Sequence, residues 1–185
     1  KDQDYTDFTG AVTGVPGGTV TIHHRGFDNF LYVRDWLMHR YAGKPVFDSV
    51  LFKRPHHERE RNTVKKLLVT GSSAGGYGAI FAYPHLKRAF PKAEAYMLGD
   101  GSSGVVSEAL LQQALRQPDE HWGAEKNLVT DIPGMDGIFN LPTELFSQGF
   151  YSALADYYPQ DRFSQYTTIF DFIQALFYNI SLNQN

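Results

Sequence analysis

The apolar run Leu67-Leu68-Val69-Thr70 is followed directly by Gly71-Ser72-Ser73-Ala74-Gly75. The run predicts a short strand buried on both faces, and residues 76–90 predict a helix that ends before Pro91. A Gly-x-Ser-x-Gly turn between a strand and a helix is typical of a nucleophile elbow, whose central residue occupies a strained backbone position. The sequence therefore predicts that Ser73 sits at a strand-to-helix junction.

The rest of the chain repeats this rhythm of short apolar runs and longer amphipathic ones. We predict further strands at residues 19–24, 95–98 and 162–167, and further helices at residues 28–41, 105–115, 143–158 and 171–180. Such alternation favours a parallel sheet with crossover helices. We interpret residues 1–185 as a single α/β domain, in which residues 117–160 are a candidate cap or substrate-facing insertion.

Composition excludes several partners and chemistries. A net charge of -3 provides no field that would attract nucleic acid or an anionic membrane. The absence of cysteine excludes disulfides, a thiolate nucleophile and Cys-ligated metal. No apolar run reaches the roughly 18 residues of a membrane span. The charge run at residues 56–61 is interpreted as a solvated loop rather than a metal site, so no metal is expected.

A serine hydroxyl is a weak nucleophile and needs both a base and donors for the oxyanion. Gly71 and Gly75 are expected to let strand and helix approach closely, and Gly76 to help that packing. The amide of Ala74 is the expected oxyanion donor. The alternative is a Gly-rich connection whose serines merely cap the helix. The glycine spacing centres on Ser73, so Ser72 is interpreted as a backbone-bonded neighbour.

The base must approach Ser73 within hydrogen-bond reach, directly or through one water. His85 lies too far along the predicted helix, roughly 18 Å at 1.5 Å per residue. His24 ends a strand expected to neighbour the nucleophile strand, which makes it the best candidate base present. The alternative for His24 is a structural hydrogen bond within its loop. His121 falls in an irregular region and is interpreted as structural.

The stretch from Leu68 to Ala79, with its Ser-Ala-Gly-Gly core, resembles the nucleophile segment of the pectin acetylesterase and Notum family of carboxylesterases. Residues 21–26 and the run Gln165-Tyr166-Thr167-Thr168 leading to Asp171 resemble bacterial members of the same family. The resemblance implies an α/β-hydrolase type fold, a mostly parallel sheet with flanking helices, here incomplete at both ends. It also suggests a secreted or periplasmic protein.

Members of this family remove acyl groups through a Ser-Asp-His triad, and the resemblance implies the same chemistry here. It places the nucleophile at Ser73, an oxyanion amide at Ala74 and the triad acid at Asp171. Asp100, also at a strand end, is the rival acid, and the alternative for Asp171 is an acidic residue in the first turn of the last helix. The family places its catalytic histidine beyond the acid, yet no histidine follows His121, so the chain looks incomplete.

We therefore expect a serine carboxylesterase-like hydrolase that removes an acetyl-like acyl group from a carbohydrate or other ester without a cofactor. Gly75, Gly76 and Tyr77 are expected to line the substrate site. Two alternatives stay open. One is a catalytically incomplete hydrolase-fold protein that binds a glycan or acyl chain. The other is a lipase or peptidase that uses the same elbow.

Overall fold

The computed structural model describes residues 2–5, 18, 20–41, 64–116 and 123–182. In chain order its strands are β1 (Asp2–Tyr5), β2 (Val20–His23), β3 (Lys66–Ser72), β4 (Glu94–Asp100) and β5 (Arg162–Tyr166). Its α-helices are α2 (Gly26–Tyr41), α3 (Ala74–Ala89), α4 (Thr143–Tyr157) and α5 (Phe172–Leu182). Shorter helical pieces are a π-helical segment, Leu110–Arg116, and two 3-10 turns, Ala124–Asn127 and Ile138–Asn140.

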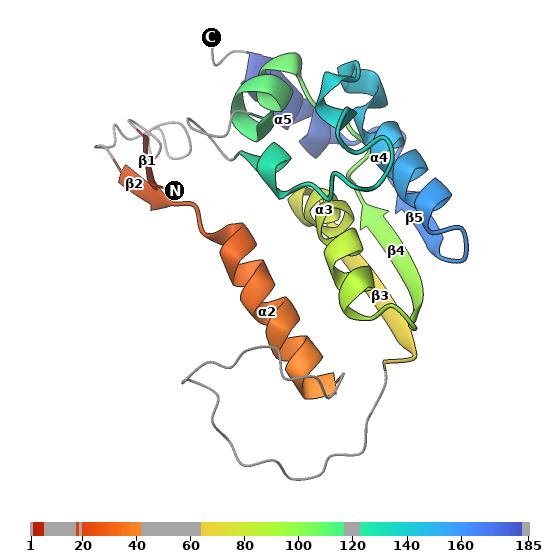
Figure 1. Cartoon of the computed structure of the whole chain (residues 1–185). Coiled ribbons are helices and arrows are strands. Elements are labelled where there is room, and N and C mark those ends of the chain that lie inside the picture. The colour runs from red at the N-terminus through yellow and green to blue at the C-terminus, as the bar shows by residue number, and fades with distance from the viewer. Residues whose placement is uncertain (1, 6–17, 19, 42–63, 117–122, 183–185) are drawn as a thin grey trace.

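The central element of the described residues is a three-stranded sheet in the order β3-β4-β5, with both pairs parallel. Ser72 is opposite Asp100, and Asp100 is opposite Tyr166, so all three strands end at one edge. In Figure 1, α3 lies against one face of this sheet and α5 crosses the end at which the strands finish. The predicted α/β class is therefore confirmed, in the form of a small parallel sheet with flanking helices.

The main hydrophobic core fills the space between the sheet and the helices on the α3 side. Val69 and Met97 contribute from the strands, and Tyr83 contributes from α3. The core also takes in buried residues from the described part of 117–160: Val129, Ile132, Met135, Ile138, Phe139, Phe146, Phe150 and Leu154. That region, a candidate cap in the sequence, thus packs against the same face of the sheet as α3.

A buried polar cluster ties the start of β5 to α3. The carboxylate of Asp161 accepts one hydrogen bond from Lys87 Nζ at 2.9 Å and another from the Tyr83 hydroxyl at 2.7 Å. Burial first, and then the adjacent carboxylate, raise the pKa of Tyr83 well above its usual value, so the phenol stays protonated. The cluster therefore anchors the start of β5 on α3.

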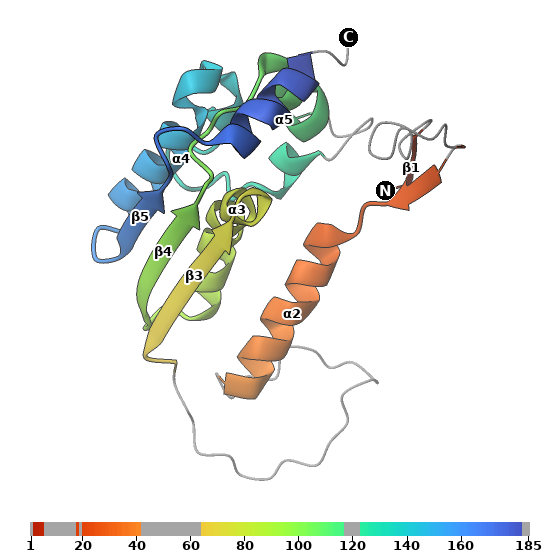
Figure 2. The same ribbon diagram turned by 180° about the vertical axis from the view of Figure 1, so that it is seen from behind.

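The opposite face of the sheet is open to solvent, which corrects the prediction that the strand at 67–70 is buried on both faces. Leu68 is 63% exposed, Leu98 is 37% exposed and Tyr166 is 61% exposed, all on this face. Figure 2 shows the sheet from this side, with no described helix in front of β3 and β4. The apolar run indicated burial correctly on alternate residues only, because the described helices cover one face of the sheet and leave the other open.

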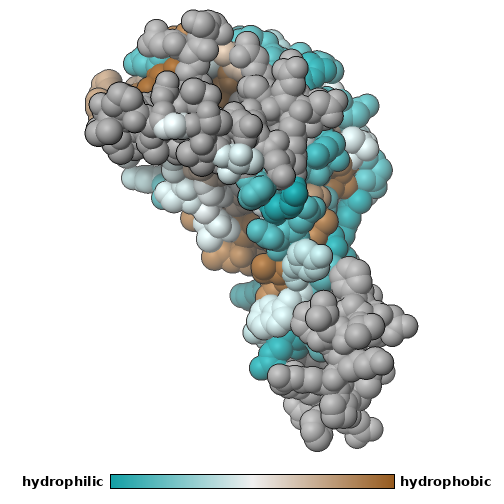
Figure 3. All heavy atoms as spheres, turned by 90° about the vertical axis from the view of Figure 1, so that its left-hand side faces the viewer, coloured by the Kyte–Doolittle hydropathy of each residue, from teal (hydrophilic) through white to brown (hydrophobic). Residues whose placement is uncertain are grey.

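The two N-terminal strands form a sheet of their own. Strand β2 pairs antiparallel with β1, with Asp2 opposite His23 and Tyr5 opposite Val20. The prediction that the strand ending at His24 neighbours the nucleophile strand is therefore wrong, because strands close in sequence have paired with each other. Helix α2 follows and packs on α3 through Phe27, Phe30, Leu37 and Met38. Figure 3 shows this side of the molecule, where hydrophobic residues gather between hydrophilic ones.

Candidate functional site

Ser73 stands between β3 and α3 in a backbone conformation that ordinary residues avoid. Its φ is 54° and its ψ is -123°, and among the described residues it is the non-glycine residue with positive φ. Such a conformation costs of the order of 1–3 kcal/mol and persists only where the surroundings enforce it. Its side chain makes no capping hydrogen bond to α3. The interpretation of Ser73 as a plain helix cap therefore loses its support.

The glycines around Ser73 differ in what they contribute. A Cβ on Gly71 would lie 2.1 Å from the carbonyl oxygen of Gly75, and one on Gly76 would lie 2.3 Å from Ser102 Oγ. A Cβ on Gly75 would meet nothing within 4 Å. The expected close approach is thus confirmed at Gly71 and Gly76, whereas the expectation that Gly75 also must lack a side chain is wrong. Gly75 contributes its backbone, against which Gly71 packs.

The first turn of α3 is closed onto the backbone of Ser73. The Ser73 carbonyl accepts hydrogen bonds from the Gly76 amide at 2.9 Å and from the Tyr77 amide at 3.4 Å. Ala74 begins the helix and is exposed, and its N–H is one of the first four of the helix, which have no acceptor within it. Its position at the helix start suits the binding of a developing negative charge.

The loop after β4 connects the elbow with the end of β5. The Ser73 amide donates to the Asp100 carbonyl at 2.7 Å, and the Gly101 amide donates to the Tyr166 carbonyl at 2.8 Å. Gly101 has φ 60°, and a Cβ there would lie 3.7 Å from Asp171 Oδ2 and 3.9 Å from the Ser73 nitrogen. Ser73 and Asp171 therefore flank one methyl-sized volume at the carboxyl edge of the sheet.

Asp171 immediately precedes α5 and caps its first turn. Its Oδ1 accepts from the Gln174 amide N–H at 2.9 Å, and its Oδ2 accepts from Gln174 Nε2 at 2.7 Å. The backbone bond from Gln174, then its side-chain bond, hold the pKa of the Asp171 carboxyl below its usual value. Asp171 is thus a helix-capping carboxylate, the alternative raised from the sequence, and it also lies at the same sheet edge as Ser73. The two roles are compatible.

Asp100, the rival acid, is the last residue of β4 and is half-buried. Its carbonyl oxygen is what holds the Ser73 amide. Tyr77 approaches the same loop from α3, where its hydroxyl accepts the Gly104 N–H at 2.9 Å. Burial raises the pKa of Tyr77, so its side chain is neutral at ordinary pH and can donate a hydrogen bond.

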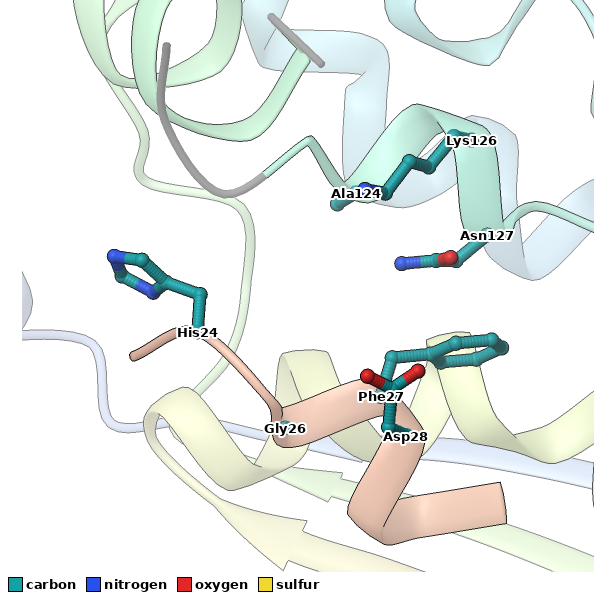
Figure 4. Close-up of a pocket in the computed structure, with 7 residues that line it drawn as sticks. All are labelled: His24, Gly26, Phe27, Asp28, Ala124, Lys126 and Asn127. Carbon is teal, nitrogen blue, oxygen red and sulfur yellow. The ribbon is translucent and has the colours of Figure 1, made fainter. Parts of the chain in front are cut away.

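The structure puts His24 in another part of the molecule's surface. His24 lines a hollow with Gly26, Phe27, Asp28, Ala124, Lys126 and Asn127, shown in Figure 4. Ser73, Ala74 and Asp171 are not among the lining residues. The role of His24 as base stays a prediction. It was favoured because its strand was expected to neighbour β3, and β2 instead pairs with β1.

His85 makes structural contacts, in keeping with its predicted distance from Ser73 along the helix. Its Nε2 lies 3.1 Å from the Asn127 carbonyl oxygen, so the Nε2–H tautomer donates there. The rings of Phe27 and Phe30 pack against it at 5.2 and 5.9 Å between centroids. Burial lowers the pKa of His85. His121 and the charge run at 56–61 lie outside the described residues.

Gln174 also belongs to this site, because it contacts the Asp171 carboxylate, and it is not among the residues predicted from the sequence. Gln174 Oε1 accepts from the Ser103 amide at 3.3 Å and from the Ser103 hydroxyl at 3.1 Å. The signal was present, because Asp171-x-x-Gln174 has the spacing of a capping box. That spacing is typical of a helix start, where the third helical residue lies next to the capping carboxylate.

The fold and the site together define a small parallel α/β protein with a strained serine at the strand edge. No protein-family model, no curated protein and no solved structure matches this chain. Within the described part of the chain, no helix has the length and apolar character to cross a membrane. In the same residues, no three His, Asp or Glu side chains come together as a metal site would require.

Proposed function

We propose that this chain is a serine ester hydrolase of the carboxylesterase type, with Ser73 as its nucleophile. The observation that carries the proposal is the strained backbone of Ser73, with φ 54°, at a turn between a parallel strand and a helix. That conformation projects a serine side chain beyond the sheet edge and next to the N–H groups that begin the helix. A strain of this kind is a reason to look for function.

The chemistry assigned to the site has two steps. Ser73 Oγ attacks an ester carbonyl while a base removes its proton, the C–O bond to the alcohol breaks, and the alcohol leaves with a proton returned by that base. Water then attacks the acyl-enzyme, releases the acid and restores the serine. The Ala74 N–H stabilises the negative oxygen in both steps. Asp171 orients the base and stabilises its positive charge.

The substrate class rests on the resemblance to pectin acetylesterases and Notum proteins. It favours a short, acetyl-like acyl group on a carbohydrate or another alcohol. Tyr77 supports a site at the same edge, because its neutral hydroxyl lies beside the loop after β4. Gly75 is exposed and adds backbone that a substrate can approach, whereas Gly76 is buried against Ser102 and supports the elbow from behind. A lipase or peptidase that uses the same elbow is the alternative within the enzyme class.

A second candidate function is a hydrolase-fold binding protein without a complete triad. It is favoured by one observation: in the described residues, neither the Ser73 hydroxyl nor the Asp171 carboxylate has a histidine as hydrogen-bond partner. In that case the site would bind a glycan or an acyl chain without turnover.

Hydrolysis of aryl esters separates these candidates. The wild type, Ser73→Ala and Ser72→Ala are compared on an acetyl ester, a long-chain acyl ester and a peptide substrate. We expect acetyl ester hydrolysis in the wild type, its loss in Ser73→Ala and its retention in Ser72→Ala, since Ser72 belongs to β3 and not to the elbow centre. Equal activity of the wild type and Ser73→Ala would refute the proposal. Folded protein without any hydrolysis supports the binding candidate.

A further inference from the structure

Gln174 joins three segments that meet at the carboxyl edge of the sheet. Its Nε2 donates to Asp171 Oδ2 at 2.7 Å and lies 3.2 Å from Thr167 Oγ1. Its Oε1 accepts from both the amide and the hydroxyl of Ser103. The residue that follows β5, the loop that follows β4 and the first turn of α5 are therefore held by one side chain.

The orientation of the Gln174 amide follows from its partners. The Ser103 backbone N–H can only donate, so the amide atom facing it is the oxygen. An ionised Asp171 can only accept, so the atom facing it is the nitrogen. The two ends of the amide thus fix each other, and flipping the amide would break bonds on both sides.

These contacts differ from those of an ordinary capping box. In that motif the glutamine side chain at the third helical position bonds back to the N–H of the capping residue. Here the cap itself is made by the Gln174 backbone N–H on Asp171 Oδ1. The Gln174 side chain instead holds Oδ2, the oxygen that lies beside Gly101 and the Ser73 elbow. Capping of α5 and control of this oxygen are therefore separable.

We infer that Gln174 is a positioning residue, which fixes the Asp171 carboxylate on the Ser73 side of the sheet edge and ties it to the Ser103 loop. Its catalytic value rests on the proposed function, in which Asp171 orients the base. Tyr77 on α3 also interacts electrostatically with Asp171, and Asp100 ends the adjacent strand. Tyr77 is neutral and Asp100 is not a hydrogen-bond partner of Asp171 in the described residues, so Gln174 is the side chain that holds Oδ2.

The titration of Asp171 tests this directly, without any need for activity. Carbon-detected NMR of the carboxyl groups is recorded for the full chain as wild type, Gln174→Glu, Gln174→Met and Gln148→Glu. Gln148 is an exposed glutamine on α4 and provides the matched control for the added charge. We expect the pKa of Asp171 to rise by about one unit in Gln174→Glu, because a like charge replaces a donor, and by less in Gln174→Met. It should not move in Gln148→Glu.

An unchanged Asp171 pKa in both Gln174 variants, with native circular dichroism, would overturn the inference. If Gln174→Glu does not fold, Gln174→Met decides, because it removes the donor without adding charge.

Labelling of Ser73 by a fluorophosphonate in the same proteins separates the two proposals. We expect Gln174→Met to slow labelling roughly tenfold relative to the wild type, through a displaced carboxylate. A shifted Asp171 pKa with undiminished labelling would overturn the positioning role. Absence of labelling in the wild type would count against the proposed function, while the titration would still decide whether Gln174 holds Asp171.

Discussion

The amide N–H of Ser73 donates to the carbonyl oxygen of Asp100 at 2.7 Å, which joins the strained elbow to the end of the neighbouring strand. This bond holds the Ser73 backbone from the side of β4, while Gly71 packs on Gly75 from the side of β3. The strain at Ser73 is therefore maintained by two independent contacts, neither of which involves its side chain. Substitutions that disturb the backbone contacts should affect folding, and substitutions of the hydroxyl should not.

Gly71→Ala tests the close approach in the elbow. Its Cβ would lie 2.1 Å from the Gly75 carbonyl oxygen, and a backbone atom cannot move aside cheaply. We expect a loss of about 3 kcal/mol in the free energy of unfolding, measured with urea. The control is Gly78→Ala on the exposed side of α3, where a Cβ meets nothing within 4 Å and should add up to about 1 kcal/mol. Equal effects of the two changes would contradict the elbow geometry.

Ser102 and Ser107 test whether a buried hydroxyl without a partner is costly. Ser102 is 2% exposed, and its Oγ has no hydrogen-bond partner among the described residues. Ser107 is 1% exposed, but its Oγ accepts the Leu110 N–H at 3.1 Å and lies 2.7 Å from Ser181 Oγ. We expect Ser107→Ala to cost about 1–2 kcal/mol and Ser102→Ala to cost nothing or to stabilise. Urea denaturation measures the free energy of unfolding of both variants. A larger loss of this free energy in Ser102→Ala than in Ser107→Ala would show that the Ser102 hydroxyl has a partner such as bound water.

The pKa of His85 predicts a pH dependence of stability. Burial lowers this pKa in the folded state below the unfolded value of about 6.5, so the unfolded chain binds the proton more tightly. The contribution of His85 is therefore fully present above pH of about 6.5 and is lost as the pH falls below that value. The free energy of unfolding is measured with urea at pH 7.5 and at pH 5.5. It should fall less between these two pH values in His85→Gln than in the wild type.

The control for this titration is His39→Gln, which removes an exposed histidine from the last turn of α2. This change leaves the burial of His85 intact. If His39→Gln and His85→Gln reduce the dependence equally, the origin assigned to burial of His85 is wrong.

Asp171→Asn separates helix capping from the role of the charge. Asparagine can still accept the Gln174 N–H and cap α5, so helix content by circular dichroism should not change. The pKa of Asp171 is lowered, so its charged form favours folding above the unfolded value near 3.8, and this contribution disappears as pH falls through the folded pKa. Asp171→Asn should lose that acid-range dependence. It should also slow Ser73 labelling by roughly a hundredfold or more if Asp171 serves a base. Unchanged labelling would favour a capping role alone.

The parts of the fold that could be predicted from sequence are those set by local pattern. The strand-turn-helix around Ser73 was visible because an apolar run, two glycines and a helix-forming segment follow one another. The helix before Pro91 and the strand and helix on either side of Asp171 follow from the same periodicity. Each of these elements is present in the structure within a few residues of its predicted bounds.

The parts that could not be predicted depend on which elements meet in space. Leu67-Leu68-Val69 has the apolar character of a buried strand, yet Leu68 faces solvent because the described helices pack on the other face of the sheet. Strand β2 has a strand's composition, which carries no information about pairing with β1 instead of β3. The contact of Gln174 with Asp171 was encoded locally, but its contact with Ser103 spans 71 residues and needs the folded chain.

Covalent labelling of Ser73 reports directly on whether its hydroxyl is activated. The wild type and Ser73→Ala are treated with a fluorophosphonate, and the adduct is located by mass spectrometry of the digested protein. We expect a single adduct on the peptide that contains Ser73 in the wild type and none in Ser73→Ala. Folded wild type without an adduct, or an adduct on another serine that persists in Ser73→Ala, would contradict the assignment of Ser73 as an activated nucleophile.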